Sequence, residues 1–205
     1  MPGRVKVAIL TFDGFNELDS FIALGLLNRL HPLGWKAEIT SPSAQVRSMN
    51  GVVVTAQQPL EFANEADIVL FGSGIHTRAI AADGAMLDRL RLDPVRQLVG
   101  GQCSGTLLMA RLGLLADMPA CTDSTTKPWV VEAGVRVVEE PFHARGPIAT
   151  AGGCLASQYL AAWAMVSRAG LDAARDALHY AAPVGEKEAY VERVLGVVKP
   201  FLPAT

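Results

Sequence analysis

Residues 95–115 read VRQLVGGQCSGTLLMARLGLL, and this stretch decides the fold. Its apolar run from Val95 to Gly101 predicts a buried strand, and its continuation from Ser104 to Leu115 predicts a helix. The two are joined by Gly101-Gln102-Cys103-Ser104-Gly105, where small residues on both sides permit a tight turn. Such a turn holds its middle residue in a strained conformation. We therefore interpret it as a nucleophile elbow that presents the Cys103 thiol above the edge of a sheet.

The rest of the chain alternates between stretches typical of strands and of helices. Val5 to Thr11 and Asp67 to Phe71 are short apolar runs typical of buried parallel strands. Asn16 predicts the N-cap of a helix after the first run, and Leu18 and Phe21 begin the expected apolar face of that helix. The alternation predicts an α/β fold: a flavodoxin-like sandwich with a mostly parallel sheet and helices on both faces.

Two hairpins are expected beside this alternation. Residues 46–54 contain Asn50-Gly51, a strong signal for a two-residue hairpin loop. The second hairpin has its arms at Val135 to Glu139 and at Ile148 to Ala151. This assignment places His143 at an exposed hairpin tip.

The composition is that of one folded domain, residues 1–205, with 50% hydrophobic and 19% charged residues. The formal net charge is -2 and no basic block is dense enough to neutralise a row of phosphates, so nucleic acid is not expected as a partner. No apolar stretch approaches the roughly 20 residues of a membrane span, and the apolar start is too short for a signal peptide. We expect a cytoplasmic protein without a membrane partner, whose cysteines are free thiols.

The position of Cys103 predicts a reactive thiol. At the start of a helix, peptide dipoles and unpaired N–H groups favour negative charge, so we expect the pKa of Cys103 to lie below that of an ordinary cysteine. Cys121 falls in an expected strand at residues 120–122 and is interpreted as inert core. The 4 histidines are scattered without metal-ligand spacing, so we expect no metal.

Three segments together resemble the ThiJ/PfpI superfamily, namely VAILTFDGFNELD at 7–19, GQCSGTLLMARLGLL at 101–115 and IATAGGCLASQYLAAWA at 148–164. This superfamily shares its fold with class I glutamine amidotransferases. The resemblance implies that Asp19, just after the first strand, hydrogen-bonds or exchanges a proton with Cys103. Glu17 is interpreted as a carboxylate that only complements the helix dipole. A homodimer is also implied, as in many relatives.

Gly72-Ser73-Gly74 falls where the family has a glycine-rich turn. The resemblance implies that the Gly74 N–H, together with the N–H of Ser104 after the cysteine, faces an oxyanion that develops on the substrate. Ser73 and Cys154 are then expected in the pocket wall. The turn lacks the later glycine of a dinucleotide fingerprint and is not a phosphate loop, so we expect no cofactor.

One difference between this chain and the family bears on which reaction is expected. Many relatives carry a histidine about twenty residues after the cysteine, where this chain has Asp123. A carboxylate does not replace an imidazole as a base near neutral pH, so the protease, amidase and amidotransferase hypotheses lose support. We expect Asp123 and His76, which lies two residues past Gly74, to line the pocket.

The isonitrile hydratase branch of the family resembles this chain most in its site pattern. That branch has an aspartate at the position of Asp19 and a hydroxyl residue after the cysteine, where this chain has Ser104. The resemblance implies a small electrophilic substrate that is hydrated through covalent attachment to Cys103. Two other hypotheses stay open. Cys103 could serve in redox or reactive-carbonyl chemistry, with Cys154 as a resolving thiol, or the chain could be a ligand-sensing module.

Overall fold

A computed structural model describes residues 4–202. The central sheet has seven strands in the spatial order β5-β2-β1-β6-β7-β9-β8. In chain order the strands of this sheet are β1 (Val5–Leu10), β2 (Trp35–Ser41), β5 (Gln58–Pro59), β6 (Ile68–Phe71), β7 (Leu98–Gln102), β8 (Phe142–Arg145) and β9 (Ile148–Ala151). All neighbouring strands pair in parallel except β8 with β9. The predicted single domain 1–205 includes residues 1–3 and 203–205, which lie outside the described residues.

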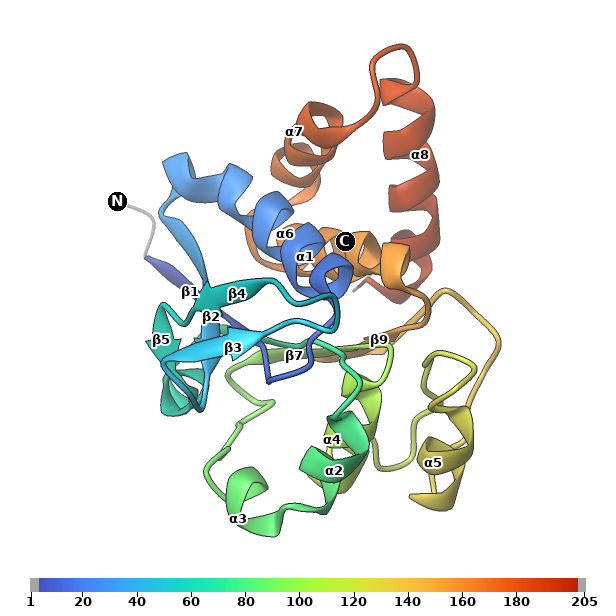
Figure 1. The fold of residues 1–205 in the computed structure, drawn as a ribbon. Coiled ribbons are helices and arrows are strands. Elements are labelled where there is room, and N and C mark those ends of the chain that lie inside the picture. The colour runs from blue at the N-terminus through green and yellow to red at the C-terminus, as the bar shows by residue number, and fades with distance from the viewer. Residues whose placement is uncertain (1–3, 203–205) are drawn as a thin grey trace.

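Helices cover both faces of the sheet (Figure 1). One layer consists of α1 (Glu17–Leu27), α6 (Ser157–Ala169), α7 (Leu171–Ala181) and α8 (Lys187–Val198). The other layer consists of α2 (Thr77–Ala82), α3 (Gly84–Leu87), α4 (Gly105–Arg111) and α5 (Lys127–Glu132). Short 3-10 helices lie between these elements: η1 (Asn28–Leu33), η2 (Leu60–Asn64), η3 (Cys154–Ala156) and η4 (Lys199–Phe201). The predicted α/β sandwich is confirmed.

The sheet separates two hydrophobic cores, and side chains along its central strands alternate between them. In β1, Val7 and Ile9 pack with the layer of α1 and α6, whereas Ala8 and Leu10 pack with the layer of α4. Successive side chains of a strand point to opposite faces, and burial on both faces makes the strand apolar throughout. This is why the buried part of β1, from Val7 to Leu10, is apolar on both sides.

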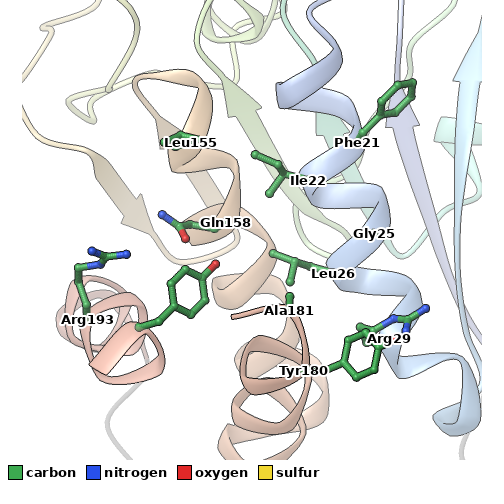
Figure 2. Close-up of a pocket in the computed structure, with 11 residues that line it drawn as sticks. Phe21, Ile22, Gly25, Leu26, Arg29, Leu155, Gln158, Tyr180, Ala181 and Arg193 are labelled. Atoms are coloured by element: carbon green, nitrogen blue, oxygen red, sulfur yellow. The ribbon is translucent and has the colours of Figure 1, made fainter. Parts of the chain in front are cut away.

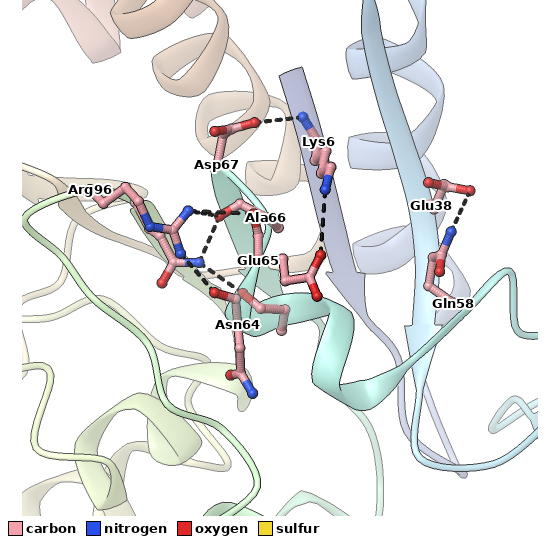
Figure 3. Close-up of polar contacts among 10 residues, drawn as sticks. Lys6, Glu38, Gln58, Asn64, Glu65, Ala66, Asp67 and Arg96 are labelled. Atoms are coloured by element: carbon pink, nitrogen blue, oxygen red, sulfur yellow. Dashed lines mark hydrogen bonds and ion pairs between the residues drawn. The ribbon is translucent and has the colours of Figure 1, made fainter. Parts of the chain in front are cut away.

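Polar contacts at the start of the strands hold β6 beside β1 (Figure 3). The Lys6 N–H donates to Asp67 Oδ2 at 2.8 Å. The Arg96 guanidinium donates to the carbonyl oxygens of Asn64 at 2.7 Å and Ala66 at 3.1 Å. Both carbonyls belong to the turn that leads into β6. The contact of Lys6 with Asp67 lies next to Val7 and Ile68, the first paired residues of the two parallel strands, whose carboxyl ends meet at the opposite edge of the sheet.

The first predicted hairpin is confirmed, as β3 (Gln45–Arg47) and β4 (Val53–Thr55) pair antiparallel. The second hairpin was wrong in its first arm, since β8 is Phe142–Arg145 rather than residues 135–139. Pro141 lies between the two positions and has no N–H to give to a ladder. His143 therefore lies within a strand and not at an exposed tip.

Two further expectations about local structure were wrong. Residues 120–122 form only an isolated bridge from Ala120 to Val137. Helix α4 ends at Arg111, short of the predicted Leu115, because Gly113 has a φ of 71° and turns the chain out of the helix.

The expected apolar face of α1 is wrong at its start, although Leu26 and Leu27 further along the helix are buried. Asn16 caps the helix as predicted, with its side-chain oxygen accepting from the Leu18 N–H at 3.1 Å. However, Leu18 and Phe21 are exposed, whereas Asp19 is buried against the sheet edge. The helix thus turns a polar residue inward at its first turn, where Asp19 meets the ends of the strands.

Over residues 4–202, none of the helices combines the length and the apolar character that a membrane crossing requires.

Candidate active site

The turn after β7 is the strained elbow that the sequence predicts. Cys103 has a φ of 47°, which side chains other than glycine rarely adopt. Glycines on both sides make the turn possible. A Cβ on Gly101 would lie 2.5 Å from Met109 Sδ, and a Cβ on Gly105 would lie 2.5 Å from the Phe71 carbonyl oxygen. The chain therefore passes from strand to helix in a space that leaves no room for a side chain at Gly101 or Gly105.

The elbow brings Cys103 together with two other predicted site residues. A carboxylate oxygen of Asp19 and the Sγ atoms of Cys103 and Cys154 all lie within 4.8 Å of one another. They come from the first turn of α1, the elbow and the start of η3. The Cys103 N–H donates to the Ala151 carbonyl at 2.8 Å, so the end of β9 positions the elbow next to Cys154.

Asp19 is held with one carboxylate oxygen occupied and the other unpartnered. The side chain is 2% exposed, and its Oδ2 accepts a hydrogen bond from the Ser73 hydroxyl. Its Oδ1 is buried without a hydrogen-bond partner among residues 4–202. The Ser157 hydroxyl donates to the Asp19 backbone carbonyl at 2.8 Å. Burial raises the pKa of Asp19 above the ordinary value of an aspartate.

The structure contradicts the expected low pKa of Cys103. Cys103 is 4% exposed, and burial, followed by the negative charge of Asp19, raises the pKa of its thiol. The dipole of α4, a helix of 7 residues, acts against these two effects. Since the thiolate and the carboxylate repel each other, the two groups titrate as a pair, and a state that keeps one proton between them is favoured over full ionisation.

The Gly72-Ser73-Gly74 turn lies against the elbow, but its donor is already engaged. The Gly74 N–H donates to Ser104 Oγ at 3.2 Å, and the Ser104 hydroxyl donates to Thr77 Oγ1 at 2.9 Å. Gly74 has no room for a side chain, because a Cβ would lie 2.5 Å from the Gly14 carbonyl oxygen. Ser104 thus links the turn to the elbow. Because the Gly74 N–H already donates to the Ser104 hydroxyl, it is not free to donate to a substrate oxyanion.

These groups open into a cavity of about 410 Å³. Its walls are formed by Asn16, Met49, Ser73, Gly74, Ile75, Cys103, Ser104, Asp123, Thr125, Thr126, Trp129 and Cys154. His76 was wrongly placed in this wall. It is exposed at the start of α2, where its ring faces Gly14, and a Cβ there would lie 2.5 Å from its Cδ2.

Asp123 reaches the cavity wall as predicted, and local bonds explain its position. Its Oδ1 accepts from the N–H groups of Thr125 and Thr126, each at 2.9 Å, which shapes the turn before α5. Aspartate and asparagine side chains form such Asx turns. The carboxylate that stands where many relatives have a histidine therefore has a structural role in the loop.

Sequence reasoning missed the role of Asn16 and the wall residues Met49 and Ile75. The Asn16 side-chain nitrogen donates to Cys154 Sγ at 3.1 Å, in addition to the capping bond of its oxygen. Only the capping signal was visible in the sequence. Met49 and Ile75 lie in loops that approach the elbow through the fold, and no local pattern marks such loops as a wall.

The expectation that no metal binds rested on the scattered histidines. The structure instead brings two thiols and a carboxylate within 4.8 Å of one another, a donor set of the kind that zinc accepts. The expectation stays a prediction.

The fold is that of solved DJ-1 and ThiJ/PfpI proteins. A ThiJ/PfpI family protein from Pseudomonas syringae superposes with a TM-score of 0.76 at 19% identity, over 96% of this chain and 88% of that one. DJ-1beta from Drosophila melanogaster has a TM-score of 0.76 at 17% identity, over 87% and 98% of the two chains. A DJ-1 superfamily protein from Salmonella typhimurium, solved as a cysteine-to-alanine mutant, has a TM-score of 0.74 at 23% identity, over 87% and 99%.

No protein-family model and no curated protein matches the chain. At these identities the likeness establishes the fold, a flavodoxin-like sandwich with a mostly parallel sheet. The resemblance to the ThiJ/PfpI superfamily is thus supported at the level of the fold.

We predict that iodoacetamide alkylates Cys103 with a pH midpoint above about 8.5, the pKa of an ordinary thiol, because burial and the charge of Asp19 raise its pKa. Asp19→Asn removes the neighbouring charge and is expected to move this midpoint to lower pH. Site-resolved mass spectrometry of the alkylated peptides over a pH series measures both values.

Cys121 is the internal control of this experiment, because burial raises the pKa of its thiol to about 12 and Asp19 is not among the groups that shift it. It should remain unmodified in both proteins up to that pH range. A wild-type midpoint below that of an ordinary thiol, or a shift to higher pH in Asp19→Asn, contradicts the explanation by burial and charge.

Proposed function

We propose that this chain is a cysteine-dependent hydratase that converts isonitriles to N-substituted formamides. The observation that carries the proposal is the unpartnered Oδ1 of Asp19, in a carboxylate that lies within 4.8 Å of Cys103 Sγ. A buried carboxyl with a raised pKa can take a proton near neutral pH and give it back. The site thus pairs a nucleophile with one acid–base group.

In the first step, the Cys103 sulfur bonds to the terminal carbon of R–N≡C. The thiol proton passes to Asp19 as this bond forms, and Asp19 then delivers it to the same carbon. The product is a thioimidate, Cys–S–CH=N–R. Covalent attachment divides one difficult hydration into two easier steps.

In the second step, water adds to the thioimidate carbon and the carbon–sulfur bond breaks. The electron pair of that bond returns to sulfur. One proton of the attacking water passes to the imine nitrogen, and the other passes through Asp19 to the sulfur. The net reaction is R–N≡C + H₂O → R–NH–CHO, and it needs no oxidant, reductant or cofactor.

The neighbouring hydroxyls keep the reacting pair in place. Ser73 donates to Asp19 Oδ2 and leaves Oδ1 for the proton. Ser104 bonds to the Gly74 N–H and to Thr77, which fixes the turn opposite the elbow. The cavity of about 410 Å³ is in the range of small-molecule sites. Met49, Ile75 and Trp129 supply an apolar surface for the R group.

The composition of the cavity wall favours hydration over amide hydrolysis. Among the described residues, no histidine lines the cavity. Expulsion of an amine from an amide needs a group that protonates it, and histidine most often performs this task. An isonitrile has no leaving group, so a single carboxyl suffices for it.

With an aryl isonitrile as substrate, Cys103→Ala is expected to abolish formamide formation, because the nucleophile is lost. Asp19→Asn should lower the rate by about 100-fold or more, because the proton carrier is lost. Formamide is followed by chromatography, and thermal unfolding of each variant verifies that the fold is kept.

Glu17→Gln is the matched control for Asp19→Asn. Glu17 lies in the same helical turn, but its carboxylate accepts hydrogen bonds from Ser48 and Asn50 of the hairpin and is not part of the cluster with Cys103. This variant should turn over within twofold of the wild type. Full activity of a folded Asp19→Asn, or equal losses in both carboxylate variants, refutes the role proposed for Asp19.

A redox function is the second candidate, and the position of Cys154 favours it. Its Sγ lies within 4.8 Å of Cys103 Sγ and accepts from the Asn16 side chain at 3.1 Å. Peroxide would oxidise the Cys103 thiol to a sulfenic acid with release of water. Cys154 would then displace a second water to form a disulfide.

Treatment of the reduced protein with one equivalent of hydrogen peroxide is expected to give a Cys103–Cys154 disulfide that dithiothreitol reverses. Non-reducing peptide mass spectrometry identifies the bridge. Cys154→Ser, which lacks the second sulfur, should carry a sulfenic acid on Cys103 after one equivalent and a sulfinic acid after a second equivalent. Over-oxidation of Cys103 in the wild type without a bridge excludes Cys154 as a resolving thiol.

We further propose that a second copy of this chain covers an apolar patch next to the site. The patch consists of the exposed residues Leu18 and Phe21 of α1 and Met49, Val52 and Val53 of the hairpin. Hairpin and helix lie side by side (Figure 1). The Met49 N–H of the hairpin donates to the carbonyl of Phe15, just before the helix, at 2.8 Å. Contiguous exposed apolar surface of this kind is typical of protein interfaces.

Sedimentation equilibrium tests this proposal at micromolar concentration. The wild type is expected to be a dimer, and Val53→Lys a monomer, because a buried unpaired ammonium is costly. Val95→Lys is the control, since Val95 is equally apolar and 97% exposed but outside the patch. A monomeric wild type, or a dimeric Val53→Lys, contradicts the proposed interface.

A further inference from the structure

A second and larger cavity lies away from the cysteine, between α1 and the C-terminal helices. It has a volume of about 660 Å³, and its wall shares no residue with the wall of the Cys103 cavity. Figure 2 shows α1 on one side of it, with side chains of α6, α7 and α8 around the remainder. The proposed hydratase reaction uses none of these residues, and the groove shares only Phe21 with the apolar patch proposed above as an interface.

The floor of the groove is apolar and open because of one glycine. Ile22 and Leu26 of α1 point into it (Figure 2). Gly25 lies between them on the same helix, and a Cβ at this position would have no atom within 4 Å. Glycine within a helix costs about 1 kcal/mol relative to alanine, and no close contact requires it here. Because Gly25 has no side chain, the groove is deeper at this position.

The groove carries positive charge without a negative partner. Arg29 and Arg193 contribute to its wall, which contains no acidic residue among those described. Neither arginine forms an ion pair within residues 4–202. Arg29 lies over the Tyr180 ring at 4.6 Å and Arg193 over the Tyr190 ring at 5.5 Å. Stacking holds a guanidinium in place by its face and leaves its N–H groups free.

We propose that this groove binds an amphipathic carboxylate. The alkyl chain lies on Ile22, Leu26 and the open surface of Gly25, where it leaves water. The carboxylate pairs with a guanidinium at one end of the groove, in the two-pronged geometry that arginine offers. Figure 2 shows Arg29 and Arg193 on opposite sides of this floor, so a chain that follows the floor ends at one of them. The volume is in the range of small-molecule sites.

Isothermal titration of the full chain with decanoate, at concentrations up to about 1 mM, tests the proposal. Saturable binding at one site per chain is expected. The double variant Arg29→Gln/Arg193→Gln should weaken it by about tenfold or more, and Gly25→Leu should abolish it by filling the groove. Decyltrimethylammonium, which has the same chain length and the opposite charge, should not saturate the site.

Arg175→Gln is the matched control, since Arg175 is an exposed arginine of α7 outside the groove, and its affinity should equal that of the wild type. Cys103→Ala should also bind decanoate normally, which separates this site from the cysteine. The proposal is overturned by absence of saturable binding, or by equal affinity in Gly25→Leu. It is also overturned if Gly25→Leu changes only the sedimentation of the protein, because the groove would then be an interface between copies.

Discussion

The close approach of backbone to backbone at the elbow is the constraint on which the rest of the site depends. Gly105 lies so near the Phe71 carbonyl that a methyl group would not fit, and a methyl group on Gly101 would meet the Met109 side chain and approach the Thr106 backbone to 3.2 Å. Because β6, β7 and α4 meet without intervening side chains, the strained residue between them is held with little freedom. The thiol of Cys103 is therefore placed by the main chain, and the groups around it are placed by the ends of neighbouring strands.

The second property of the site is that it contains three acidic groups that are not all ionised at the same time. Asp19, Cys103 and Cys154 lie within 4.8 Å of one another, and burial raises the pKa of each. Water solvates these groups poorly, and each negative charge opposes the next. A proton is thus retained by the cluster and can move within it. Acid–base chemistry with one carboxyl is a natural use of such a cluster, and formation of a disulfide is another outcome of the same crowding.

Much of this could be predicted from the sequence, because the informative signals were local. The elbow, the Asn16 cap and the alternation of strands with helices depend on neighbouring residues, and all three are confirmed. The low pKa expected for Cys103 was wrong because burial depends on the whole fold, and so does the outward position of His76. The hairpin arm at Phe142–Arg145 was missed because the preceding Val135 to Glu139 run has the same apolar character. The roles of Asp19 and Cys154 remain predictions supported by proximity.

The chemically reactive residues of the site and the apolar residues of the cavity wall come from different parts of the chain. The groups that react come from the ends of strands and the first turn of α1, which the core holds rigidly. Met49 comes from the β3–β4 hairpin, which forms a separate two-stranded sheet outside the central one. A change in the length or sequence of that hairpin would alter the shape of the cavity, while the thiol and its neighbouring carboxyl stay where they are. The set of molecules that fit the cavity can therefore diverge in evolution while the cysteine and the carboxylate keep their positions.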